Sequence, residues 1–368
     1  MAHQGVEIGI STFYQSSKLT KIVIPETVKS IGNYAFYGCS SLEEVTIPSS
    51  VTSIGGNVFE GCKMLFKITI PDSVKSIGLS CFRDCTTLIQ VDLPPHLNII
   101  PNFTFYGCSA MIQIKIPSSV KNIGVSAFER CELLYDVSLS PSLISIDNCA
   151  FCSCSSLKEI SIPSTVSSIG KSCFNGCESL KEIILPSSLM AIHNYCFKKC
   201  TSLEKVIIPS SIKLIEESAF ESCGSLKFIE IPSSVSLFGF NVFKACKNLE
   251  KISISGPIDK ISSGLFRDCV SLQKVEIPSS VESIGNYAFC SCASLTDISI
   301  PPSVVSIGDY AFFQCELLEK IDIPKSVQTI GKFAFNECSS LKEVSLPSSF
   351  EDVYQLGFPF SAKINKID

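Results

Sequence analysis

One pattern repeats through the chain from its beginning to its end at a constant spacing of twenty-three residues, without an insertion or a deletion. Phenylalanine marks the period, and sixteen such periods account for the whole length (16 × 23 = 368). The marker residues are Phe13, Phe36, Phe59, Phe82, Phe105, Phe128, Phe151, Phe174, Phe197, Phe220, Phe243, Phe266, Phe289, Phe312, Phe335 and Phe358. A unit this short cannot bury its own apolar face, so the repeat predicts stacked units that share one core.

Other positions are fixed relative to the phenylalanine. Cysteine stands three residues after it in fourteen units, with Ser16 and Ser361 in the end units. Leucine stands six residues after it, with Met111 and Ile364 as the exceptions. Isoleucine or valine follows at nine residues, isoleucine or leucine at eleven, and proline comes next in most units. Because several positions recur at the same place in every unit, equivalent side chains are expected to contact one another between neighbouring units.

The residues before each proline alternate between apolar and polar. In the second unit Val45 and Ile47 point one way, and Glu44 and Thr46 point the other. Alternation with β-branched residues predicts a half-buried strand. Pro48 cannot donate to a ladder and is expected to end it.

The residues around the phenylalanine have a different spacing. Ile31 is followed at spacings of four, five and eight by Ala35, Phe36 and Cys39, which predicts one short helical turn entered through Gly32. The sequence therefore predicts an α/β repeat solenoid, with a parallel β-sheet on one face and short helical turns on the other.

The repeat LxxIxIPxSVxxIGxxAFxxCxSL resembles the 23-residue leucine-rich repeat of the BspA-like class, also called the Treponema pallidum type. The resemblance covers nearly the whole chain. It implies a horseshoe or arc of sixteen units, with the sheet on the concave face and the helical turns on the convex face. Members of the class are typically microbial surface antigens that bind host matrix proteins or other cells, so the resemblance implies a non-enzymatic, protein-binding adhesion protein at the cell surface.

Composition restricts the partners. The formal net charge is -5 with a pI near 5.4, and no run of Lys and Arg indicates binding to nucleic acid. No apolar segment approaches the ~20 residues of a membrane helix, so membrane insertion is not expected. The first residues, MAHQGVEIGISTFYQSSK, show no signal-peptide pattern. The residues themselves thus leave a cytoplasmic location open, with an intracellular scaffold or regulatory subunit as the alternative function.

The repeat leaves no linker, so we expect a single solenoid over residues 1–368. Residues 1–19 form a partial N-terminal unit, and residues 348–368 form a divergent C-terminal capping unit. The bare end of a solenoid exposes strand edges and core. The expected state is a monomer or a weak end-to-end association.

The chain has twenty cysteines. The fourteen at the repeat position are expected to be small buried apolar groups, and parallel side chains do not favour disulfides between neighbouring units. Cys81, Cys173 and Cys196 precede a marker phenylalanine and are also expected in the core. Cys152 and Cys290 follow one and are expected to be exposed, which keeps an oxidisable thiol open as an alternative.

No catalytic or cofactor motif is present. The segment Cys149–Cys154 (CAFCSC) has cysteines at metal-ligand spacing, but no nearby histidine or second pair completes a tetrahedral site. His3, His96 and His193 are the only histidines, and none lies in a motif with a nucleophile. We therefore expect neither an enzyme, nor a metal centre, nor a cofactor.

The residues that change between units indicate where a protein partner binds. Eight residues after the phenylalanine, Asp136, Glu159 and Glu182 succeed one another, which places like charges one strand apart and favours a basic partner. A solvated charged face is the alternative.

Apolar residues interrupt the outward positions in the middle of the chain. Ile184, Ile207 and Phe228 are expected to form a small exposed patch beside the acidic residues, and such patches often mark interfaces. A second apolar row at seven residues after the phenylalanine, here called the edge row, is an alternative site. Its members are Phe66, Ile89, Ile112 and Tyr135.

Overall fold

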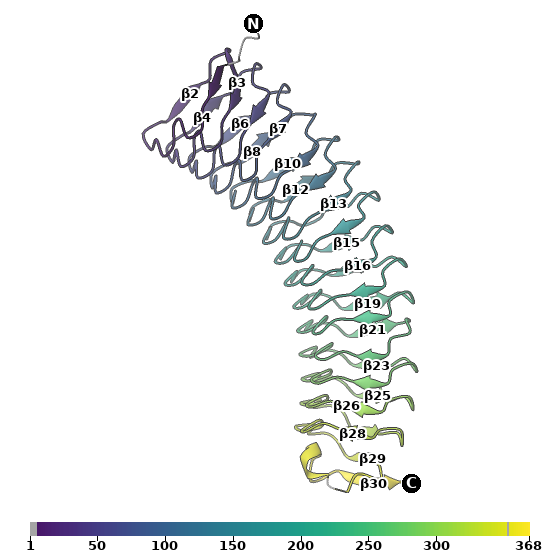
Figure 1. The fold of residues 1–368 in the computed structure, drawn as a ribbon. Coiled ribbons are helices and arrows are strands. Elements are labelled where there is room, and N and C mark those ends of the chain that lie inside the picture. The colour runs from purple at the N-terminus through teal and green to yellow at the C-terminus, as the bar shows by residue number, and fades with distance from the viewer. Residues whose placement is uncertain (1–5, 352) are drawn as a thin grey trace. The chain divides into compact units, whose positions relative to one another are not determined.

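A computed structural model describes residues 6–351 and 353–368. It divides into two compact units, Met1–Ser188 and Leu189–Asp368, which are taken separately below. Within each unit, successive coils of the chain stack in sequence order (Figure 1). Most coils contribute short strands to two rows, and the strand pairs of the described residues are parallel. Both units are parallel β-solenoids, as the repeat predicts, and the prediction of one continuous solenoid over residues 1–368 stays a prediction.

The first strand row is formed by the alternating segments that precede the prolines. Its members are β2 (Lys21–Val23), β4 (Glu44–Thr46), β6 (Lys67–Thr69), β8 (Gln90–Asp92), β10 (Gln113–Lys115), β12 (Asp136–Ser138), β15 (Glu182–Ile184), β17 (Lys205–Ile207), β19 (Phe228–Ile231), β21 (Lys251–Ile254), β23 (Lys274–Glu276), β25 (Asp297–Ser299), β27 (Lys320–Asp322), β29 (Glu343–Pro347) and β30 (Lys363–Ile367). Most of these strands cover their central β-branched residue and expose the residues on either side, as in β4.

The second strand row comes from the segments just before the glycine of each repeat. Its members are β1 (Val6–Ile8), β3 (Val28–Ile31), β5 (Ser53–Ile54), β7 (Ser76–Ile77), β9 (Ile99–Ile100), β11 (Asn122–Ile123), β13 (Ser145–Ile146), β14 (Ser168–Ile169), β16 (Ala191–Ile192), β18 (Leu214–Ile215), β20 (Leu237–Phe238), β22 (Lys260–Ile261), β24 (Ser283–Ile284), β26 (Ser306–Ile307) and β28 (Thr329–Ile330). One 3-10 helix, η1 (Tyr354–Leu356), lies near the C-terminus.

The pairing register equals the sequence repeat. Lys21 lies opposite Glu44, and Ser283 lies opposite Ser306, each one full repeat further along the chain. Equivalent side chains therefore lie directly above one another, and the buried ones form columns through the core. The phenylalanine column is the largest: neighbouring rings stack with centroids 5.1 Å apart for Phe13 and Phe36.

The prediction of short helical turns is wrong. Between the second strand row and the cysteine the chain forms tight turns, in which the Tyr37 N–H bonds to the Tyr34 oxygen at 3.1 Å. The N–H groups between these bonds join the next coil instead, as the Phe36 N–H does to the Val58 oxygen at 3.0 Å. An α-helix would turn every N–H back along its own axis, and a segment this short does not form a stable helix alone. The backbone takes a positive φ at Tyr34 and Gly38, which successive turns of this kind require.

The last coil is shorter than the sequence alignment suggests. Phe358 continues the ring column, 4.9 Å from Phe335, but the strand that follows it starts early. Ile364 pairs with Val344 in the first strand row and does not occupy the leucine position, since the register of this last pair is three residues shorter than the repeat. The expectation that residues 348–368 act as a cap remains a prediction.

The structure was searched for helices that could span a membrane. No helix in the described ranges has both the length and the apolar character to span a bilayer.

Candidate functional site

The first strand row carries the residues that differ most between coils. Its outward positions, eight and ten residues after the phenylalanine, are mostly exposed. In several coils they pair charges of opposite sign across neighbouring strands: Lys21 Nζ lies 2.7 Å from Glu44, and Lys274 Nζ lies 3.1 Å from Asp297. Exposed pairs of this kind contribute little stability, but they neutralise the face locally.

The acidic residues form an exception to this pattern in the first unit. Asp136 begins β12 and Glu182 begins β15, while Glu159 lies between them in a coil that has no strand in the first row. All three carboxylates are exposed. In the described part of the chain, neither Asp136 nor Glu159 has a lysine or arginine nitrogen within 4.0 Å.

A cavity of about 1190 Å³ lies over these residues. Three successive coils line it: Tyr135, Asp136 and Val137 from the first, residues 158–162 with Ser164 from the second, and Lys181, Glu182, Ile184 and Pro186 from the third. The carboxylates predicted from the sequence therefore share one hollow, and Lys158 and Lys181 stand beside them. Charged and apolar side chains line this hollow in similar measure.

The predicted apolar patch falls partly in each unit. Ile184 is 56% exposed at the end of β15 in the first unit, next to the acidic residues. In the second unit β17 and β19 lie side by side, and they carry Ile207 (41% exposed) and Phe228 (48% exposed). Each residue is exposed as expected, and a single surface formed by all three stays a prediction.

The edge row is less uniform than its spacing suggests. Phe66 and Tyr135 are exposed, but Ile89 and Ile112 are half-buried just before the strands β8 and β10. Their backbones are joined to one another, since the Ile112 N–H bonds to the Ile89 oxygen at 3.2 Å. Only Tyr135 of this row also lines the cavity.

Comparison with known protein families identifies the same kind of repeat. The family described as BspA type Leucine rich repeat region (6 copies) matches residues 6–135, 132–250 and 259–368. The chain belongs to this BspA-type leucine-rich repeat family. No curated protein matches it.

Among solved structures, a leucine-rich repeat protein from Bacteroides ovatus ATCC 8483 is 33% identical, with a TM-score of 0.67 over 99% of this chain and 88% of that one. A leucine rich cell surface protein from Faecalibacterium prausnitzii A2-165 is 27% identical, with a TM-score of 0.48 over 92% and 82% of the two chains. A leucine-rich repeat protein of T. pallidum is 28% identical, with a TM-score of 0.43 over 54% and 82%. The family model and the Bacteroides ovatus structure confirm the resemblance inferred from the repeat motif.

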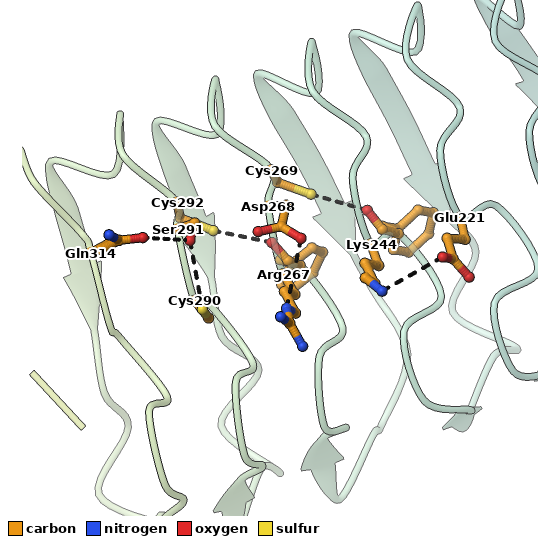
Figure 2. Close-up of polar contacts among 11 residues, drawn as sticks. Glu221, Lys244, Arg267, Asp268, Cys269, Cys290, Ser291, Cys292 and Gln314 are labelled. Atoms are coloured by element: carbon orange, nitrogen blue, oxygen red, sulfur yellow. Dashed lines mark hydrogen bonds and ion pairs between the residues drawn. The ribbon is translucent and has the colours of Figure 1, made fainter. Parts of the chain in front are cut away.

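The cysteines of this BspA-type protein are structural. All twenty are thiols outside disulfides, and the fourteen at the repeat position are fully buried. Their thiols donate hydrogen bonds to a phenylalanine carbonyl in the preceding coil, as Cys269 does to Phe243 at 3.1 Å and Cys292 to Phe266 at 3.2 Å (Figure 2). The expected core position is confirmed, but the residue is a donor as well as an apolar group.

The additional cysteines before a marker phenylalanine follow the prediction, but Cys152 and Cys290, which were predicted to be exposed, do not. Cys81, Cys173 and Cys196 are buried, as expected. Cys152 is half-buried, and burial raises the pKa of its thiol to about 11, which makes it a poor nucleophile near neutral pH. The prediction that Cys290 is exposed is wrong.

The neighbours of Cys290 explain its burial. Side chains at this repeat position stack from coil to coil, and the small thiol lies between the positions of the larger Arg267 and Phe313. Its sulfur lies 3.6 Å from the Ser291 hydroxyl, and the Ser291 O–H donates to the side-chain oxygen Oε1 of Gln314 at 3.1 Å (Figure 2). The same row holds the ion pair of Lys244 with Glu221 at 3.7 Å.

Sequence reasoning missed an aromatic column on the turn side of the second unit. Tyr287 stacks on Tyr310 with centroids 5.1 Å apart, and Tyr310 contacts Phe333 at 5.5 Å. All three take a positive φ, which is uncommon for bulky residues. Aromatic residues two positions before the marker phenylalanine in three successive repeats are the sequence signal that could have revealed it. Arg267 lies over the Tyr287 ring at 5.2 Å.

Metal ligation has no support from the geometry. The described residues contain no group of three or more histidine, cysteine or carboxylate side chains close enough to hold a metal ion. His193 Nδ1 lies 3.2 Å from the Glu216 carboxylate of the next coil, which makes a surface pair in the turn region.

Proposed function

We propose that this BspA-type protein is a non-enzymatic, protein-binding repeat protein at a microbial cell surface, where it attaches to host or cell-surface proteins. The observation that supports this proposal best is the acidic hollow of the first unit. Charges in several other coils of the first strand row are matched across strands, whereas Asp136 and Glu159 are left without a cationic partner in the described residues. Unmatched like charges cost stability, and a basic partner surface removes that cost.

The apolar outward residues are proposed as further contact positions, taken separately in each unit. Ile184 stands at the rim of the hollow, and Ile207 and Phe228 offer apolar area on the strands of the second unit. Aromatic and aliphatic anchors with a polar surround are the usual composition of a protein interface. The carboxylates then increase the rate of association and the anchors slow dissociation.

A binding assay against immobilised host matrix proteins tests the proposal. The chain should bind at least one of them, and the double variant Asp136→Lys, Glu159→Lys should weaken the binding at least tenfold. Glu343→Lys, an exposed carboxylate at the same repeat position in the paired strand β29, is the matched control and should bind like the parent. Phe228→Glu tests the apolar anchors separately. Equal binding by parent and double variant would move the interface away from the hollow.

The twenty cysteines outside disulfides favour one second candidate, an intracellular scaffold or regulatory subunit, because reducing compartments keep cysteines in the thiol form. Burial of the repeat cysteines makes free thiols compatible with the cell surface as well. Labelling intact cells with a membrane-impermeant amine reagent separates the two. Protection of the protein until the cells are lysed would remove the adhesion proposal and support the intracellular one.

A further inference from the structure

The first strand row is interrupted at several joints, but among the coils between β2 and β30 only the one that carries Glu159 forms no strand in this row in the described structure. In the preceding coil the Tyr135 N–H bonds to the Ile112 oxygen at 3.1 Å, and the Ile116 N–H bonds to the Ser138 oxygen at 2.8 Å. The equivalents one repeat further on, from Lys158 to Tyr135 and from Leu139 to Ser161, are absent from the described structure.

The opening extends to both sides of this segment. None of the backbone N–H and C=O groups of residues 159–162 has a backbone partner in the described part of the chain. One bond remains nearby, from the Lys181 N–H to the Lys158 oxygen at 3.2 Å. A row of unpaired backbone groups is the template on which another strand can be added.

The rest of the coil is closed, which confines the opening to the first strand row. In the second row β13 and β14 pair in the usual register, so that Ile146 lies opposite Ile169. The Phe151 ring stacks on Phe128 at 5.2 Å, and the Cys154 thiol bonds to the Phe128 oxygen at 3.2 Å. The coil is therefore fixed on its other sides, and the opening is a local wedge between folded neighbours.

Two inward side chains beside the opening are half-buried, Val137 and Ile162, while Ile160 of the same coil is buried. Val137 and Ile162 both line the cavity described above. An added strand would cover them and also supply the missing backbone bonds.

We propose that this opening accepts an extended, cationic peptide segment of the partner by strand addition against residues 159–162. The inference rests on the proposed function and names its mode of recognition. Backbone groups of the peptide pair with those of the open coil, and its lysine or arginine side chains alternate onto the outward face. There they meet the carboxylates of Asp136, Glu159 and Glu182, which line the cavity with Tyr135 and Ile184 at its rim.

The charge pattern selects a cationic segment over an acidic one. Three carboxylates occupy the outward positions of three successive coils, where an added strand would place its own outward side chains. An acidic segment would add like charges directly opposite them. Lys158 and Lys181 lie one position earlier, beside Tyr135, at the end of the hollow.

The probe is a short fluorescent peptide of alternating lysine and threonine, titrated with the full chain and followed by fluorescence anisotropy. Its matched control is the same peptide with N-methyl groups on the threonine backbone nitrogens, which keeps every charge and removes donors. Strand addition predicts roughly tenfold weaker binding of the methylated peptide, since several backbone bonds are lost together. Glu159→Lys should also weaken the unmethylated peptide at least tenfold, and Glu343→Lys should leave it unchanged.

The outcomes are separable. Equal affinity for both peptides would overturn strand addition, because charge alone would then account for binding, and no binding of either peptide would overturn it as well. The proposed function stands independently if matrix proteins still bind the parent chain and lose affinity for the double variant. Conversely, peptide binding that requires free backbone N–H groups, without any matrix protein bound, would support the open edge and remove the adhesion proposal.

Discussion

The thiol of Cys62 donates a hydrogen bond to the carbonyl oxygen of Phe36, 3.3 Å away in the preceding coil. The same oxygen accepts the N–H of Cys39 at 3.1 Å. Each buried phenylalanine carbonyl of this kind thus has one partner within its own turn and one in the next coil. The cysteine column ties neighbouring coils together through side chains where the backbone alone would leave an acceptor half-satisfied.

Replacing a repeat cysteine in the middle of a unit should therefore separate its two roles. Cys131→Ala removes both the bond to Phe105 and buried volume, and should lower the free energy of unfolding by about 1–2 kcal/mol. Cys131→Ser keeps a donor and should cost no more than alanine. Urea denaturation measures both, with Cys152→Ala as a near-neutral control. A serine variant clearly less stable than the alanine variant would show that the thiol acts only as an apolar group.

Buried thiols should make the protein sensitive to alkaline pH. Burial raises the pKa of Cys81 and of Cys246 to about 12, above the ordinary value of about 9. The folded state holds these protons more tightly than the unfolded state, so their contribution is complete below pH 9 and is lost as pH rises toward 12. The free energy of unfolding should fall by about 1.4 kcal/mol per pH unit for each such thiol.

Urea midpoints measured on both sides of pH 9 test this dependence. The double variant Cys81→Ala, Cys246→Ala should start less stable than the parent and lose stability less steeply above pH 9. Parallel pH profiles for the two proteins would contradict the assignment of the alkaline loss to these thiols.

The phenylalanine column should be the most sensitive part of the core. The Phe128 ring lies 5.3 Å from Phe105 and 5.2 Å from Phe151 and is fully buried. Phe128→Ala should cost about 3–5 kcal/mol, because the stacked rings on both sides prevent the cavity from collapsing. Phe66→Ala, on the exposed edge row, should change stability by less than about 0.5 kcal/mol. Thermal unfolding, monitored by circular dichroism, distinguishes the two variants. Similar losses of stability in Phe128→Ala and Phe66→Ala would mean that the phenylalanine column is not rigid.

The core was predictable from the sequence because the period alone determines it. A register of one full repeat puts Phe36 beneath Phe59 and Cys39 beneath Cys62, whatever the backbone does between them. Burial of these columns follows, since apolar side chains at one repeat position can only cover one another. Ile364 shows the limit: three residues are missing before the last strand, and the sequence alignment alone gave it the wrong position.

The turns were not predictable from spacing. Positions of Ile31, Ala35 and Cys39 fit a helical turn as well as they fit successive tight turns, because both bring these side chains to one side. The backbone decides between them through bonds to the next coil, such as the Gly38 N–H to the Glu60 oxygen at 2.7 Å. A pattern of apolar residues within one repeat contains no information about bonds between repeats.

The charges of the candidate site were predictable, but its opening was not. Ile160 and Ile162 alternate with polar residues as in the neighbouring coils, so the pattern predicts an ordinary strand there. The structure has none. The only sequence signal for the opening was the succession of Asp136, Glu159 and Glu182. Like charges on adjacent strands repel, which is a physical reason for weaker strand pairing at this coil.

Hydrogen exchange should reveal the open coil directly. Amides of residues 159–162 have no backbone acceptor in the described structure and should exchange within seconds, whereas the Gly170 amide of the same coil bonds to the Ile146 oxygen at 2.8 Å and should be protected. Mass spectrometry of peptic fragments resolves the two segments. Equal protection of both would mean that the first strand row is closed in solution.

The origin of the opening can be tested with the same measurement. If repulsion among the carboxylates keeps the coil from pairing, Glu159→Lys places a cation between Asp136 and Glu182 and should slow exchange of residues 159–162 several-fold. Glu159→Gln removes one charge without adding the opposite one and should have a smaller effect in the same direction. Raising the salt concentration should slow exchange in the parent, because salt screens the repulsion among the three carboxylates. It should not slow exchange in the lysine variant, because there salt screens an attraction between the lysine and the two remaining carboxylates. Unchanged exchange in both variants would place the cause in the backbone of the coil, independent of its charge.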